Sequence, residues 1–147
     1  MSDEKYFQLI GAALMDAEQG TSNALFALGD EEAFLTQDPL GLFGLTWEDI
    51  KEKGEALWAK VSPKIYAIFC EATNAEQKTL ANLISSGSTE VAGAVAAVLS
   101  TYLLGLVPAI AVGTVAYFIA KLVLEKFFQS AFDAGCQAWK ATLKPEP

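Results

Sequence analysis

The sequence predicts an all-α protein, a single-domain helical bundle of about seven helices around a central hydrophobic helical hairpin. Apolar residues recur at helical spacing along most of the 147 residues. No run alternates apolar and polar side chains for long enough to indicate a strand, and the Asn-Gly and Asp-Gly turns of tight β-hairpins are absent. Residues 91–120 contain no charged side chain, so we expect this stretch to be buried in the bundle or in a membrane.

The first part of the predicted domain, residues 1–45, holds one acidic helix, short helices and a loop. Ser2 is a suitable N-cap for a helix that ends at Gly20. After Gly20 the pattern breaks into short pieces, separated by Gly29 and by the Asp38-Pro39 step, which predict one or two short helices and a loop. The apolar stripe of the first helix consists of Phe7, Ile10, Leu14 and Ala17.

Amphipathic helices follow in residues 46–87. Thr46, with Asp49 three residues later, has the pattern of a capping box at the start of a helix. Ser62 followed by Pro63 predicts a new N-cap with a proline in the first turn of a second helix. A glycine at position 87 closes the last helix of this part. We therefore expect several helices here, each with one apolar face.

The hydrophobic hairpin is predicted in residues 88–128, with a first arm from Glu90 to Leu104 and a second arm that starts at Pro108. Gly105 and Pro108 favour a turn, because a proline inside one continuous helix costs about 3 kcal/mol. Neither arm reaches the roughly 20 apolar residues that cross a bilayer. Small residues spaced four apart allow close helix packing, which suits a buried hairpin and a membrane hairpin equally. The candidate residues of this membrane or core hairpin are Val91, Gly93, Ala97, Leu104, Pro108, Gly113 and Phe118.

The remaining residues predict a C-terminal helix at 129–143, which completes a domain of residues 1–143, and a disordered tail at 144–147. The amino terminus is acidic and lacks the apolar core of a secretory signal, so we expect a cytoplasmic protein, with membrane association as an open alternative. In a reducing compartment, Cys70 and Cys136 are expected to be two small buried hydrophobes rather than a disulfide. Their spacing fits no zinc motif.

Charge is distributed unevenly along the chain, which has a formal net charge of -8. Residues 1–56 carry 12 acidic side chains and 3 lysines, a net charge of -9, whereas residues 57–147 carry 6 acidic side chains and 7 lysines, a net charge of +1. Such a field disfavours nucleic acid, and the absence of arginine removes the usual bidentate contacts to phosphate. The acidic first third would suit a basic protein partner, or it serves solubility alone.

No catalytic, cofactor-binding or metal-binding motif is found, and we expect a protein that is not an enzyme. The chain has no histidine, so Ser-His-Asp and Cys-His arrangements cannot form. The consecutive acids at 30–32 are typical of a solvated helix start and lack the spaced ligands of a calcium loop. The glycine-rich stretch at Leu40, Leu42 and Phe43 is a candidate docking loop, unless it folds back over the core.

In layout alone, residues 46–143 resemble colicin-type pore-forming domains and Bcl-2-like proteins, which hide a hydrophobic hairpin inside a helical bundle. No motif supports the resemblance, so no functional residue is transferred from it. We expect a non-enzymatic protein that acts by association, with a concealed hairpin that engages membrane lipid after rearrangement, in a pore-forming or membrane-perturbing manner. Glu90, which flanks the hairpin, is the candidate gate. The alternative is a soluble protein-protein adaptor or assembly domain, with a homo-oligomer as one form, in which the hairpin is only a structural core.

Overall fold

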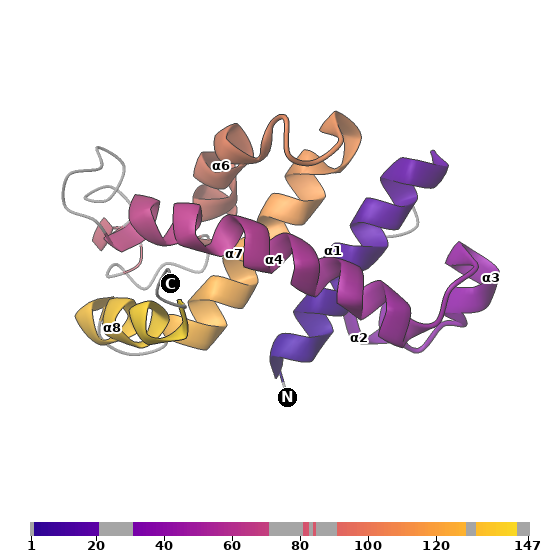
Figure 1. Cartoon of the computed structure of the whole chain (residues 1–147), viewed down its shortest axis with the longest axis horizontal. Helices are drawn as coiled ribbons and strands as arrows, with labels where there is room; N and C mark the ends of the chain where they lie inside the picture. Colours follow the sequence, from indigo (N-terminus) through magenta and orange to yellow (C-terminus); the bar gives the residue numbers. More distant parts are fainter. Residues whose placement is uncertain are drawn as a thin grey trace.

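The computed structural model describes residues 2–20, 31–70, 81–82, 84, 91–128 and 132–143. Within these ranges the structure contains helices and one isolated backbone bridge but no strand, which confirms the predicted all-α bundle. The bridge joins Leu104 to Val107. The helices are α1 (Ser2–Gln19), α2 (Glu31–Leu35), α3 (Pro39–Phe43), α4 (Trp47–Cys70), α6 (Val91–Leu103), the 3-10 turn η2 (Ala109–Ala111), α7 (Val112–Phe127) and α8 (Phe132–Thr142) (Figure 1).

The crossing of α1 and α4 brings two helix backbones into direct contact (Figure 1). Two glycines make this approach possible. A Cβ atom at Gly11 would lie far inside van der Waals contact with the carbonyl group of Ile50, and one at Gly54 would overlap the carbonyl group of Phe7 in the same way. Each helix therefore presents a glycine to the other's backbone, and any larger residue would force the pair apart.

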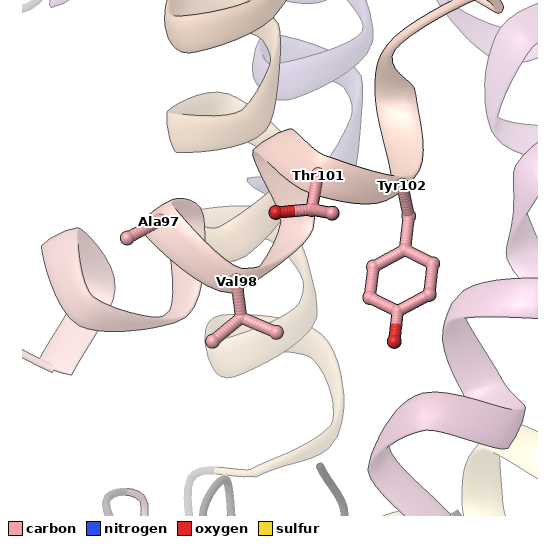
Figure 2. Close-up of a pocket in the computed structure, with 4 residues that line it drawn as sticks. All are labelled: Ala97, Val98, Thr101 and Tyr102. Atoms are coloured by element: carbon pink, nitrogen blue, oxygen red, sulfur yellow. The ribbon is translucent and has the colours of Figure 1, made fainter.

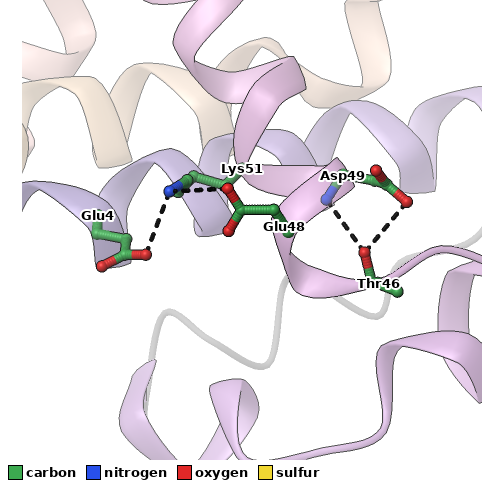
Figure 3. Close-up of polar contacts among 5 residues, drawn as sticks. All are labelled: Glu4, Thr46, Glu48, Asp49 and Lys51. Atoms are coloured by element: carbon green, nitrogen blue, oxygen red, sulfur yellow. Dashed lines mark hydrogen bonds and ion pairs between the residues drawn. The ribbon is translucent and has the colours of Figure 1, made fainter.

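The start of α4 follows the predicted capping box. The backbone N–H of Asp49 donates to Thr46 Oγ1 over 3.2 Å, and the Thr46 hydroxyl donates to Asp49 Oδ2 over 3.1 Å (Figure 3). Lys51, one turn further on, places its Nζ 3.3 Å from both Glu4 of α1 and Glu48 (Figure 3). The hydrogen bond to Glu4, then that to Glu48, raises the pKa of Lys51 above 10.5. The Lys51–Glu4 contact therefore ties the N-terminal part of α4 to α1.

The expected helix start at Ser62 and Pro63 is wrong, because α4 continues without a break to Cys70. Pro63 lies on the exposed side of the helix. Its missing N–H would have paired with the carbonyl of Ala59, which is also an exposed residue, so water can satisfy that oxygen. Ser62 is buried and caps nothing; its Oγ accepts a hydrogen bond of 3.0 Å from the indole N–H of Trp139.

The hydrophobic hairpin forms as predicted, with α6 and α7 packed against each other. The two arms have different environments. Helix α7 also contacts α1, α8 and η2, and ten of its 16 residues are buried. Helix α6 buries only one face, through Val95, Ala96, Leu99 and Leu103. The centre of the bundle is therefore α7, and α6 is an outer helix.

The expectation of two unpaired cysteines is wrong, because Cys70 and Cys136 form a disulfide. Their Cα atoms lie 5.7 Å apart although 66 positions separate them in the sequence. The last residue of α4 lies next to α8 only in the folded structure. The spacing of the two cysteines in the sequence could not show that they lie close enough to bond. Both cysteines are half-buried.

Candidate functional site

The turn between α6 and α7 is the most exposed apolar part of the described structure. Gly105 has a φ of 87°, a left-handed conformation that glycine adopts readily. The N–H groups of Leu106 and Val107 donate to the carbonyl of Leu103 over 3.0 and 3.1 Å, which closes the end of α6. Pro108 then precedes η2, and its carbonyl accepts from the N–H of Ala111 over 2.8 Å. The turn is therefore a defined structure built on the predicted glycine and proline.

Large apolar side chains gather at this turn. In the parts of the chain with an assigned structure, four large hydrophobic residues are exposed, and three of them flank the turn. Leu104 is 62% exposed, Ile110 70% and Tyr102 41%. We call these three residues the hairpin tip. The segment that joins α6 to α7 lies at the edge of the molecule, on the opposite side from α8 (Figure 1).

The outer face of α6 continues this uncharged surface. Gly93, Ala97 and Thr101 are exposed and lie four residues apart, so they form one ridge along the helix. Beside the ridge, Ala97, Val98, Thr101 and Tyr102 line an open depression of about 320 Å³ (Figure 2). Figure 2 shows the Tyr102 ring pointing away from its helix at one side of the depression. An exposed helix face on a water-soluble surface usually carries charges, and this one has none.

The predicted hairpin residues divide between this surface and the core. Exposed on the surface are Gly93, Ala97, Leu104, Pro108 and Gly113, whereas Val91 is half-buried. Phe118 is fully buried in the core. The predicted gate, Glu90, lies outside the described residues.

An ion cluster, which the sequence did not predict, connects α7 to two other helices. Lys121, on α7, is the first charged residue after the uncharged stretch, and its Nζ lies 2.7 Å from Oε2 of Glu31 on α2. Lys5 of α1 lies 3.5 Å from the other oxygen of the same carboxylate. The Glu31 side chain is only 10% exposed. One carboxylate thus links three helices, and no local sequence signal could have revealed it, because Glu31 and Lys121 are 90 positions apart.

The candidate docking loop is a short helix rather than an open loop. Asp38 caps α3 through its side chain, which accepts from the N–H of Leu40 over 3.0 Å, and Gly44 ends the helix with a φ of 75°. Phe43 is buried in an aromatic cluster, and Leu42 is half-buried against the core. Leu40 alone stands out, 59% exposed. Most of this stretch therefore covers the core. The cluster around Phe43 also contains Phe34 and Trp47.

The described residues offer no group of three or more metal-ligating side chains. A second open cleft, about 410 Å³, lies where α4, α7 and α8 meet, between Trp58, Pro63, Lys126 and Leu143. Its walls are largely apolar. Among the helices assigned here, none combines the length and hydropathy needed to cross a bilayer. Comparison with protein-family models, curated proteins and solved structures finds no match to this chain.

Proposed function

We propose that this protein is not an enzyme and acts by association, through insertion of the hairpin tip into the surface of a lipid bilayer. The observation that carries the proposal is the gathering of exposed Tyr102, Leu104 and Ile110 around one turn, inside a segment without charge. Aliphatic side chains favour the acyl region of a bilayer, and a tyrosine favours the headgroup level. A protruding turn of this kind fits a fluid surface, which can deform around it.

Charge selects the kind of lipid. The tip carries no lysine, and the chain has a formal net charge of -8, so anionic headgroups would repel the protein rather than recruit it. We therefore propose a neutral, zwitterionic surface as the target. Association with it should depend little on salt concentration, because no screened charge contributes.

The strength of tip insertion follows from the exposed area. Complete burial of a leucine or isoleucine side chain stabilises by about 1.5–3 kcal/mol. Leu104 and Ile110 are about two thirds exposed, so together with Tyr102 they supply about 3 kcal/mol. This is enough for weak and reversible docking. In the proposal, a later rearrangement that separates the hairpin from α1 brings the arms into the bilayer and perturbs it.

Vesicle flotation tests the proposal. Wild-type protein is mixed with phosphatidylcholine vesicles and centrifuged in a density gradient, and we expect a fraction to float with the lipid. The double substitution Leu104→Asp and Ile110→Asp should abolish flotation. Leu40→Asp is the control, and each single tip substitution is compared with it, because it places one aspartate at an exposed leucine of α3, outside the tip. Absence of wild-type flotation, or equal flotation of the tip variant, would overturn the proposal.

A second candidate is a protein-protein adaptor that docks through the ridge of Gly93, Ala97 and Thr101. Small residues spaced four apart let another helix approach closely, and a second copy of this chain offers the same ridge. Sedimentation velocity would show a dimer that Ala97→Glu disrupts. Ala56→Glu, at an exposed alanine of α4, is the control. A monomer at all concentrations would exclude the self-association form of this function.

A further inference from the structure

Helix α8 buries few of its described side chains against the rest of the protein. It contains 11 residues, a length at which an isolated helix is marginal in water. Of its residues from 134 onward, Gly135 and Trp139 are buried and Cys136 is half-buried, whereas the other positions up to 142 are exposed. Cys136 and Trp139 lie three residues apart and so share one face of the helix. Among residues 134–142, these two side chains are the main anchors of α8.

The Trp139 anchor fills an aromatic pocket formed by α4 and α7. Its side chain is fully buried and stacks on Phe127, with ring centroids 5.0 Å apart and an interplanar angle of 5°. Phe69 and Phe128 lie 5.5 and 6.1 Å from it, and its N–H is bonded to Ser62. If α8 moved away, these rings would face water. Helix α8 thus covers a concealed apolar surface.

We infer that the Cys70–Cys136 disulfide is a redox-controlled clasp, and that its reduction by a dithiol releases α8 and exposes the aromatic pocket. The disulfide joins α8 to the last residue of α4 beside the pocket. When it is closed, Cys136 is held beside the last residue of α4, so α8 stays tethered next to the pocket. When it is open, Trp139 and the close fit of Gly135 against Phe127 must hold the helix without a covalent bond.

The chemistry is ordinary thiol–disulfide exchange. One thiolate of the dithiol attacks a sulfur of the bridge, forms a mixed disulfide and displaces the other cysteine as a thiolate, which takes up a proton. The second thiol of the reagent then displaces the remaining cysteine and closes its own disulfide. Two electrons and two protons pass from the dithiol to Cys70 and Cys136. Both residues are half-buried rather than fully enclosed, so we expect a small reagent to reach the bridge.

This inference is independent of the lipid proposal, because the pocket lies on a different part of the molecule from the hairpin tip. It predicts two states. In an oxidising compartment α8 is fixed, whereas a cytosolic dithiol pool would open the clasp.

Hydrogen exchange read by mass spectrometry tests the clasp on the full-length chain. The oxidised protein is compared with protein reduced by dithiothreitol, and alkylation confirms by mass that both thiols are free. We expect the amides of α8 to exchange at least about tenfold faster after reduction, while those of α1, in the same sample, change less than about twofold. The double substitution Cys70→Ser and Cys136→Ser should reproduce the reduced pattern without reductant.

Three results would overturn the inference. Free thiols in the air-oxidised protein would show that no bridge forms. Unchanged α8 exchange after complete reduction would show that the Trp139 anchor holds the helix alone. An equal rise in α1 and α8 would show that the bridge stabilises the whole fold rather than one helix.

Discussion

The substitution Gly11→Ala tests the closest helix contact in the structure. A Cβ atom at this position would lie less than 3.0 Å from the carbonyl oxygen, the carbonyl carbon and Cγ2 of Ile50. Two of these atoms belong to the backbone of α4, so no side-chain rotation can remove the overlap. Helices α1 and α4 would have to separate by about 1 Å or more to restore van der Waals contact.

The magnitude is a balance of two opposed effects. Alanine is a better helix former than glycine by about 1 kcal/mol, which alone would stabilise α1. Separation of the helices loosens the packing of Ile10 and Ile50, both fully buried, along the whole crossing. Overpacking of this kind costs about 1–3 kcal/mol, and more where backbone must move. Because the backbone must move, we expect the cost to lie at the upper end of this range and the net loss to be about 1–2 kcal/mol, which lowers the melting temperature by roughly 5 °C.

Urea and thermal unfolding, followed by circular dichroism, measure this loss. Gly93→Ala is the matched control, because it makes the same change within a helix where a Cβ atom meets nothing within 4 Å. The free energy of unfolding of this control should rise by about 0.5–1 kcal/mol, the helix-propensity gain without the clash. If the two variants have the same stability, the backbone contact between α1 and α4 does not limit side-chain size, and the argument from close approach is refuted.

Three further predictions concern polar contacts. Trp139→Phe should lower the free energy of unfolding, measured in urea, by about 2–3 kcal/mol, because it removes side-chain volume from the core and leaves buried Ser62 without its indole donor. A loss below about 0.5 kcal/mol would contradict this. Glu31→Gln should lower the free energy of unfolding by about 1–2 kcal/mol, because the carboxylate pairs with two lysines. The loss should be smaller at 1 M salt, which screens the ion pairs, and equal losses at low and high salt would argue against an ionic role. The pKa of Lys51 is raised by its hydrogen bond to Glu4 and by that to Glu48. The stability that protonated Lys51 adds to the fold is therefore present below about pH 10.5 and is lost as the pH rises through the raised pKa of this lysine. Urea midpoints should therefore fall less steeply from about pH 9 to about pH 11.5 in Lys51→Met than in wild type, and identical slopes would contradict this.

The features that the sequence predicted correctly depend on neighbouring residues. Helix α1, its end at Gly20, the capping box at Thr46 and the turn at Gly105 and Pro108 each arise within a few positions of the chain. Local propensity and periodicity are sufficient for such elements. The charge-free stretch also predicted the hairpin, although it did not show that one arm would be central and the other peripheral.

The features that the sequence did not predict depend on residues far apart in the chain. Pro63 has the local pattern of a helix start, yet α4 continues through it. The buried residues of α4 before and after Pro63 stabilise the helix by more than the one lost hydrogen bond costs. The Cys70–Cys136 pair and the Glu31–Lys121 pair join helices that meet only in the folded state. The exposed surface at the hairpin tip could not be predicted for the same reason, since the exposure of its side chains depends on which neighbouring helices cover α6.

The disulfide also determines how the chain would respond to mechanical force. It closes a loop that contains both arms of the hairpin, so tension applied at the two ends of the chain bypasses α6 and α7. Only the segments outside the loop can extend. With 66 positions between its two ends, the bridge withholds a contour length of roughly 220 Å. When the oxidised molecule is pulled, no force would therefore act along its most apolar segment. That segment would bear force only after the bridge is reduced.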